Sequence, residues 1–205
     1  MKYLIYSSGH AGGHCTPRAR EWGKMRIPLA RYGFRELLIG TVAAAALAAV
    51  SLYVSFWPGV VIIGLLWLCL LAFFRDPERA CQKDPDVLLS PADGTVMDVE
   101  EMEAPTFIEG KVVRVGIFMS VLNTHVNRSP ARGRVRYVEH FEGAFHDARN
   151  PLSATENEHT LVGMDMDDGP SLLVNLIAGA VARRVVCTLE HGDHPEQGER
   201  IGMVK

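Results

Sequence analysis

The sequence predicts a mainly β domain, a small barrel or sandwich, attached to an N-terminal helical membrane hairpin. Residues 37–74 of the 205-residue chain carry no charged side chain, which is typical of apolar helices in a bilayer. From residue 87 onward, turn signals recur about every 8–12 residues between β-branched runs, the spacing typical of small barrels and sandwiches. No amphipathic helical pattern appears after Arg75, so strands dominate the rest of the chain.

The charges are unevenly distributed along the chain. Residues 1–35 carry seven cations and one anion, whereas Arg75 to Lys205 carries fourteen cations and 22 anions. The acidic part has no basic stripe with interleaved aromatic side chains, so we expect no nucleic-acid partner. With 48% hydrophobic residues, the chain is also too apolar to be disordered as a whole.

Residues 1–24 differ in composition from the rest of the chain, being rich in glycine, serine and histidine without a period. Met25 opens a basic stretch that leads directly into the apolar segment. We therefore predict that residues 1–24 are disordered or come from a start codon assigned too far upstream.

We predict that residues 25–75 form a basic flank and a membrane hairpin. Leu37–Trp57 has about the length that a helix needs to cross a bilayer, and Val60–Phe74 is a second uncharged run after Pro58-Gly59. Cations precede and follow the hairpin, which predicts that both of its ends lie at the cytoplasmic face of the cell membrane. These cations are Arg26, Arg31, Arg35, Arg75 and Arg79. A pair of buried core helices is the alternative interpretation.

Residues 76–86 are rich in proline and charge and predict a linker, and residues 87–205 predict the β-rich domain. Glycines precede or interrupt the β-rich runs, as glycines do at the corners of small barrels. The strand-like runs are 88–102, 111–121, 133–143 and 171–189, followed by a short final strand.

The four cysteines, Cys15, Cys69, Cys81 and Cys187, form no C-x-x-C pair and no cysteine–histidine set with zinc spacing. We therefore expect neither a metal site nor a structural disulfide, and interpret the cysteines as small apolar residues in a reducing compartment.

Two residues are candidates for chemistry. Asp93 lies in the turn S-P-A-D-G, where its carboxylate could bond its own backbone or orient a histidine. His125 follows an apolar strand within the polar cluster N-T-H-V-N-R-S, at the kind of strand end where rigid scaffolds present active groups. The residues alone leave a structural and a catalytic interpretation open for both.

Five segments together resemble the phosphatidylserine decarboxylase family in its short bacterial form, type A. They are A-F-F-R-D-P-E-R at 72–79, S-P-A-D-G-T-V at 90–96, F-M-S-V-L-N-T-H-V-N-R-S-P at 118–130, I-A-G-A-V-A-R-R-V-V-C at 177–187 and G-D-H-P-E-Q-G-E-R-I-G-M-V-K at 192–205. The resemblance runs in the same order from Met25 to the end of the chain, with the apolar hairpin where the family has its membrane anchor.

The resemblance implies a proenzyme that makes its own cofactor. In the family, a serine that follows a glycine near the C-terminus attacks the preceding carbonyl and becomes a pyruvoyl group on a small α subunit. An aspartate–histidine pair activates that serine, and Asp93 and His125 match this pair. The pyruvoyl ketone accepts the electrons freed as CO2 leaves phosphatidylserine, which gives phosphatidylethanolamine.

The sequence departs from the family pattern at two places. Longer members carry a second histidine where this chain has Arg128, so His125 could serve in self-cleavage, in decarboxylation or in both. The sequence also contains no Gly-Ser pair, and in the family that pair follows soon after G-E-R-I-G-M-V-K. The resemblance therefore implies the large β subunit, which lacks the serine that becomes the cofactor and is inactive without it.

Two other functions compete with this one. The A-D-G-T-V and E-H-G-D-H-P-E-Q-G-E-R-I-G segments also resemble turns of biotinyl- and lipoyl-like carrier domains, which present a lysine at a hairpin tip. Neither Lys111 nor Lys205 is expected at such a tip. A catalytically inactive lipid-binding adaptor is the other alternative.

Overall fold

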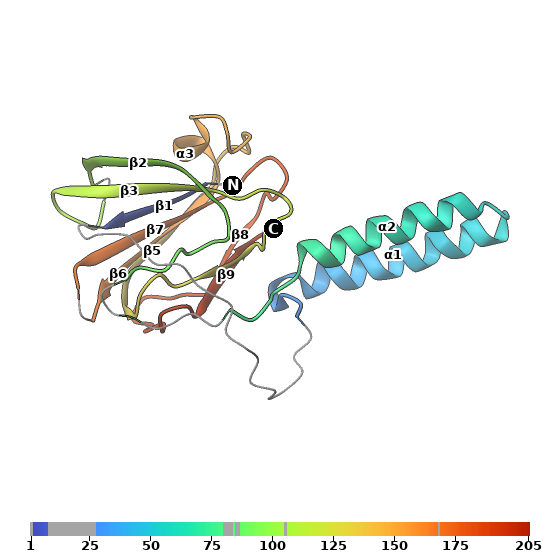
Figure 1. The fold of residues 1–205 in the computed structure, drawn as a ribbon, viewed down its shortest axis with the longest axis horizontal. Helices are drawn as coiled ribbons and strands as arrows, with labels where there is room; N and C mark the ends of the chain where they lie inside the picture. The colour runs from blue at the N-terminus through green and yellow to red at the C-terminus, as the bar shows by residue number, and fades with distance from the viewer. Residues whose placement is uncertain (1, 8–27, 80–83, 85–86, 105, 168) are drawn as a thin grey trace. The chain divides into compact units, whose positions relative to one another are not determined.

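The computed structural model describes residues 2–7, 28–79, 84, 87–104, 106–167 and 169–205 (Figure 1). The chain divides into two compact units, a helical unit at Gly23–Glu78 and a β unit that combines Met1–Trp22 with Arg79–Lys205. Two apolar helices and a largely β remainder confirm the predicted fold class.

The helical unit is an antiparallel hairpin of α1 (Phe34–Tyr53) and α2 (Trp57–Phe73), preceded by the short 3-10 helix η1 (Arg31–Gly33). Glycine permits close contact between the two arms, since a Cβ atom at Gly40 would lie 2.4 Å from Leu70 Cδ2. One polar contact also joins them, because the Trp67 indole donates a hydrogen bond of 3.1 Å to the Thr41 hydroxyl.

The turn of the hairpin lies earlier than the sequence pattern indicated. The chain reverses at Val54–Phe56, where Ser55 adopts a positive φ of 55°. Pro58 lies in the first turn of α2 instead of breaking the helix, because the first backbone N–H groups of a helix have no intrahelical acceptor to lose.

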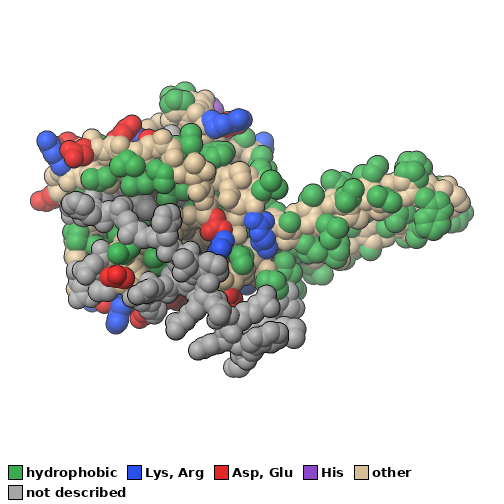
Figure 2. Space-filling view, in the orientation of Figure 1, with side chains coloured by type: hydrophobic (Ala, Val, Ile, Leu, Met, Phe, Trp, Pro, Cys, Tyr) green, Lys and Arg blue, Asp and Glu red, His purple; other side chains and the backbone are tan. Residues whose placement is uncertain are grey.

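The outer surface of the hairpin is apolar along both helices (Figure 2). Arg31–Tyr53 is long and apolar enough to cross a bilayer, with a mean hydropathy of 1.8. Only 6% of its most apolar 18-residue stretch is buried, and Trp57–Phe73 is shorter. Exposed apolar surface of this extent is typical of segments that contact a membrane or another protein.

The β unit contains two antiparallel sheets. The six-stranded sheet has the order β2-β3-β1-β7-β6-β5, and the three-stranded sheet has the order β4-β9-β8. The first consists of β2 (Thr95–Glu103), β3 (Lys111–Phe118), β1 (Lys2–Ser7), β7 (Ser171–Ile177), β6 (His159–Met166) and β5 (Gly133–Phe141). The second consists of β4 (Val126–Arg128), β9 (Arg200–Val204) and β8 (Val185–Cys187). A single helical turn, α3 (Ser153–Glu156), lies between β5 and β6.

Strand β1 comes from the segment whose composition predicted disorder or a misplaced start. Lys2–Ser7 pairs antiparallel with β3 on one side and with β7 on the other. The remainder of that segment, residues 8–24, and its first residue lie outside the described residues.

The core of the β unit is formed by β6, β7 and β9. Successive side chains of a strand point to opposite faces, and in β7 both faces are covered, so every residue from Leu172 to Ile177 is buried. The largest fully buried apolar side chains are Met164, Leu172, Leu173, Leu176, Ile177, Ile201 and Met203. Cys187 is a half-buried free thiol at the end of β8, and burial raises its pKa, as expected for a structural cysteine.

Gly202 sets the spacing of the three-stranded sheet. It pairs with Asn127 of β4 and Cys187 of β8, and a Cβ atom there would lie 2.1 Å from the Val186 carbonyl oxygen. Only glycine permits this approach without a shift of the backbone.

Gly202→Ala should therefore destabilise the β unit by about 1–3 kcal/mol through overpacking. The measurement is thermal unfolding by circular dichroism in detergent. Gly64→Ala is the matched control, because an added Cβ there meets no atom within 4 Å, and it should leave the Tm unchanged or raise it. Equal Tm values for Gly202→Ala and the unsubstituted protein would contradict the described sheet.

Candidate active site

A cavity of about 300 Å³ opens at one end of the β unit, and three separate chain segments line it. The segments are the end of β3 with the loop that follows it, the loop after β5, and the loop between β7 and β8 (Figure 1). The lining residues are Phe118, Met119, Ser120, Val121, His125, Asp147, Ala148, Arg149, Gly179, Ala180, Val181 and Ala182.

His125 contributes the histidine ring of this cavity. Its side chain is 1% exposed, and its Nδ1 lies 2.9 Å from the Asn123 carbonyl oxygen. A carbonyl oxygen only accepts hydrogen bonds, so this contact assigns the proton to Nδ1. In the neutral ring, Nε2 then carries the lone pair and is the atom able to take up a proton.

The segment before His125 is fixed by a closed turn. Asn123 Oδ1 accepts hydrogen bonds from the Ser120 backbone N–H at 2.8 Å and from its hydroxyl at 2.7 Å. The Asn123 N–H donates back to the Ser120 carbonyl at 3.0 Å. The carbonyl that orients His125 therefore belongs to a rigid turn and not to a mobile loop.

The C-terminal strand runs directly beside His125. The Val204 N–H donates to the His125 carbonyl at 3.2 Å, which extends the pairing of β9 with β4 by one residue. Lys205 and Arg184 exchange two backbone hydrogen bonds, of 2.8 and 2.6 Å. The last residues of the sequence are thus ordered between the histidine and the loop of Gly179–Ala182.

Asp93 lies in a turn held between the strands that flank His125 in the chain. The Arg128 N–H in β4 donates to the Pro91 carbonyl at 2.9 Å, and a Cβ atom at Gly94 would lie 2.5 Å from the Phe118 carbonyl at the end of β3. The Asp93 carboxylate itself forms a partly exposed ion pair with Arg79. The turn of Asp93 is thus anchored to Phe118 and Arg128, which lie before and after His125 in the chain. The described side-chain partner of Asp93 is Arg79 and that of His125 is Asn123, so the structure shows no hydrogen bond between the two predicted site residues.

Two polar side chains next to His125 in sequence are buried without a hydrogen-bond partner in the described part of the chain. They are Thr124, through its hydroxyl, and Asn127, through both amide atoms. Asn127 is two residues from His125, and in an extended strand such residues point to the same face. Buried polar groups normally find partners, so these atoms are available to hydrogen-bond a group bound beside His125.

One wall of the cavity carries an exposed ion pair. Arg149 donates two hydrogen bonds to the Asp147 carboxylate, of 3.0 and 2.8 Å. These bonds lower the pKa of Asp147 well below its usual range and raise the pKa of Arg149. The pair therefore stays fully charged at neutral pH.

Asn157 holds two walls of the cavity together. Its Nδ2 donates to the His146 and Ala178 carbonyls, both at 2.9 Å, and its Oδ1 accepts from the His146 N–H at 2.8 Å. Sequence analysis did not identify this residue, because a single asparagine in a charged loop carries no signal of the contacts it makes after folding. Asn157 is a positioning residue for the loop that carries Asp147.

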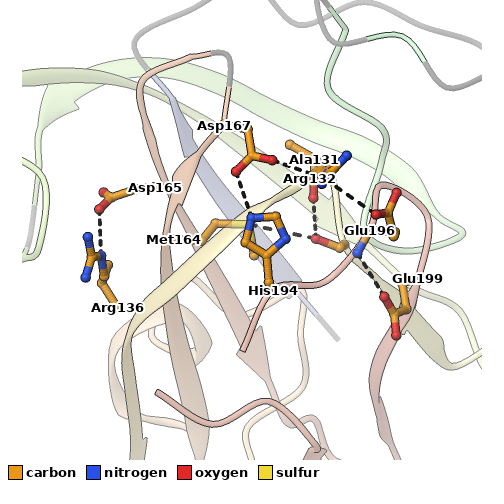
Figure 3. A network of polar contacts seen from close by, with 10 residues as sticks. Ala131, Arg132, Arg136, Met164, Asp165, Asp167, His194, Glu196 and Glu199 are labelled. Atoms are coloured by element: carbon orange, nitrogen blue, oxygen red, sulfur yellow. Dashed lines mark hydrogen bonds and ion pairs between the residues drawn. The ribbon is translucent and has the colours of Figure 1, made fainter. Parts of the chain in front are cut away.

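An aspartate–histidine pair that the sequence analysis did not predict lies elsewhere in the β unit (Figure 3). His194 Nε2 is 2.8 Å from Asp167 Oδ1, and Arg132 contacts the other oxygen of the same carboxylate at 3.0 Å. Arg132 also lies 3.5 Å from Glu196. The pair is exposed and is shared with an arginine, so we interpret this network as surface electrostatics that joins two loops.

Within the described residues, no group of three histidine, cysteine or acidic side chains has the geometry of a metal site. Biotinyl- and lipoyl-like carrier domains present a lysine at a hairpin tip, and neither Lys111 nor Lys205 lies at one. Lys111 begins β3, and Lys205 pairs with Arg184.

A buried histidine at the wall of a small cavity, supported by two sheets, is an arrangement typical of an enzyme. Residues 66–205 match the family described as phosphatidylserine decarboxylase. The chain is 40% identical over 163 residues to the phosphatidylserine decarboxylase proenzyme of Symbiobacterium thermophilum, covering 80% of this chain and 75% of that protein. It is 36% identical over 181 residues to the proenzyme of Carboxydothermus hydrogenoformans, covering 88% and 83% of the two chains.

The chain therefore belongs to the phosphatidylserine decarboxylase family. The similarity to the Anaplasma phagocytophilum proenzyme is of the same order, at 38% identity over 163 residues, with 79% of this chain and 71% of that protein covered. The matched region includes every residue that lines the cavity.

Asn157→Ala should loosen the cavity wall, because it removes the partner of one buried backbone group, the Ala178 carbonyl, and of two part-buried groups of His146. A buried group left unsatisfied costs about 1–3 kcal/mol. Amide hydrogen exchange in residues 143–149 should become faster than in the unsubstituted protein. Asn150→Ala is the matched control, since the Asn150 side chain caps only the exposed Leu152 N–H. Unchanged exchange in Asn157→Ala would show that the side chain does not hold this loop.

Proposed function

We propose that this protein decarboxylates phosphatidylserine to phosphatidylethanolamine as the large subunit of a short, type A, pyruvoyl-dependent enzyme. One observation carries the proposal. The family match covers a cavity with a buried histidine whose Nε2 is the atom able to take up a proton. Membership of the family supports the substrate, and the site supports the proton chemistry.

The residues around His125 fit a pyruvoyl group supplied by chain beyond Lys205. The backbone of Val204 and Lys205 is already paired beside the histidine, so a continuation of the chain starts next to the cavity. The buried Thr124 hydroxyl and Asn127 amide offer hydrogen bonds in the same region. We propose that the serine, and the small α subunit it heads after self-cleavage, lie in that continuation, so that the present chain is inactive without it.

A pyruvoyl ketone supplies an electron sink for the electrons released with CO2. The chain's own residues supply proton transfer and position. His125 Nε2 takes the proton from the attacking serine during self-cleavage, and a proton on the same atom is returned to the carbon that loses CO2. The Asn123 carbonyl holds the ring in the tautomer that this role requires.

Asp93 is proposed as the acidic partner of His125 during self-cleavage. Its ion pair with Arg79 is partly exposed, and such pairs contribute only about 0–1 kcal/mol. Both ring nitrogens of His125 already have a role, Nδ1 on the Asn123 carbonyl and Nε2 in proton transfer, so we propose that Asp93 acts through its charge and not through a direct hydrogen bond. A negative charge near His125 favours the imidazolium that forms when the serine is deprotonated.

We propose that the helical unit anchors the protein in the cell membrane with the β unit at the cytoplasmic face. The hairpin exposes apolar side chains along both helices, while arginines lie at its ends. Cations at both ends of a hairpin favour the cytoplasmic side for both. On this proposal, residues 25–75 form the membrane segment, residues 76–86 form the linker, and residues 87–205 form the catalytic domain.

His125→Ala in the full gene product should lower CO2 release by about 10²–10⁴-fold, the usual contribution of a general acid–base residue. Release of CO2 from carboxyl-labelled phosphatidylserine measures turnover, and intact mass measures self-cleavage. His140→Ala is the control, because His140 contacts Thr160 and does not line the cavity. Full activity of His125→Ala in both steps would remove His125 from the mechanism and refute the proposal.

Deletion of residues 37–74 should release the β unit from membranes, because the deleted segment contains nearly all of the apolar helical surface. Flotation with phospholipid vesicles in high salt measures attachment. A deletion variant that still floats in high salt would show that the hairpin is not the principal anchor.

A further inference from the structure

The rim of the cavity carries exposed apolar side chains on separate loops. Val121 and Val181 line the cavity and are also exposed, Val181 to 69%. Leu122, the next residue after Val121, is 81% exposed. The transfer of large apolar side chains at such exposed loop tips from water into an apolar environment is favourable.

Cations and an aromatic ring accompany these apolar side chains. The Arg183 guanidinium lies 5.7 Å from the centre of the exposed Phe145 ring, and its Nε donates to the Ala180 carbonyl at 3.0 Å. Arg149, paired with Asp147, lies on the same rim. Apolar tips beside arginines and an aromatic ring match the boundary between acyl chains and phosphate groups in a bilayer.

The size of the cavity adds a second constraint. At about 300 Å³ it lies at the lower end of the usual range for small-ligand sites, about 300–1,000 Å³. A polar headgroup fits such a volume, whereas two acyl chains do not. A diacyl lipid with its headgroup beside His125 must therefore keep its chains outside the cavity, in contact with the rim.

We propose that the rim surface, defined as Val121, Leu122, Phe145, Val181, Arg149 and Arg183, docks against the headgroup region of a phospholipid bilayer. The apolar tips enter the acyl boundary, and Arg183 faces the lipid phosphates. A phospholipid then moves its headgroup into the cavity without leaving the membrane. This inference rests on the proposed function for the identity of the lipid, and the contact with the bilayer is a separate property of the surface.

The chain's connectivity favours a bilayer over another protein as the occupant. The apolar helices end at Phe73 and the β unit resumes at Arg79, so a hairpin anchored in a bilayer leaves only a short tether. Anionic phospholipids also provide the negative charge that complements Arg183.

The test places an environment-sensitive fluorophore on the rim of the full-length chain. Leu122→Cys is made with the four native cysteines changed to serine, labelled with nitrobenzoxadiazole and mixed with equimolar phosphatidylcholine–phosphatidylglycerol vesicles. We expect a blue shift on vesicle addition and quenching by lipids brominated in the upper acyl chain. Val181→Cys is a second reporter in case the first variant folds poorly.

Val99→Cys is the matched control, because Val99 is a similarly exposed apolar residue on β2, outside the cavity rim. Its label should show no quenching in the same vesicles. Failure of both rim labels to respond, failure of the labelled chain to bind vesicles, or equal quenching at position 99 would overturn the proposal. A blue shift that depends on protein concentration and needs no vesicles would also overturn it, in favour of a second copy of the chain as the occupant.

The fluorescence readout does not depend on catalysis. In the full gene product, quenched rim labels without any CO2 release would retain the membrane contact and refute the proposed decarboxylase activity. Turnover without quenching of the rim labels would support the proposed activity and refute the contact between the rim surface and the bilayer.

Discussion

The backbone ladder that joins β9 to β4 and β8 is the constraint on which the rest of the site depends. It fixes the carbonyl of His125 through Val204 and aligns Lys205 with Arg184, which lies beyond the loop that walls the cavity. Strands β8 and β9 can lie this close together because Gly202 has no side chain facing the Val186 carbonyl. A residue without any functional group therefore determines where the histidine and the end of the sequence meet.

The fold class was predictable because its signals are local. An uncharged run and regularly spaced turn residues act within a few neighbours, and both appear in the structure as the hairpin and the strands. The turn of the hairpin was misplaced by a few residues because proline is compatible with the first turn of a helix as well as with a break. The central position of β1 was not predictable, because its partners lie more than a hundred residues away in the chain.

The candidate site was predictable only in part, for the same reason. His125 was conspicuous as part of a polar cluster at a strand end, and the structure buries it at the cavity. Arg149 lines the cavity and Asn157 holds its walls through loops that meet only after β5, β6 and β7 have paired. The pairing of Asp93 with Arg79 likewise depends on tertiary structure, which no turn motif encodes.

The place of β1 in the six-stranded sheet makes Lys2–Ser7 the link between β3 and β7. Without Lys2–Ser7, β3 and β7 would face each other across a gap of about 10 Å, twice the spacing of neighbouring strands. Both edges would present unpaired backbone groups, which makes such a gap a receptor for a strand from another polypeptide. The six-stranded sheet is thus continuous within one chain only while Lys2–Ser7 lies between β3 and β7.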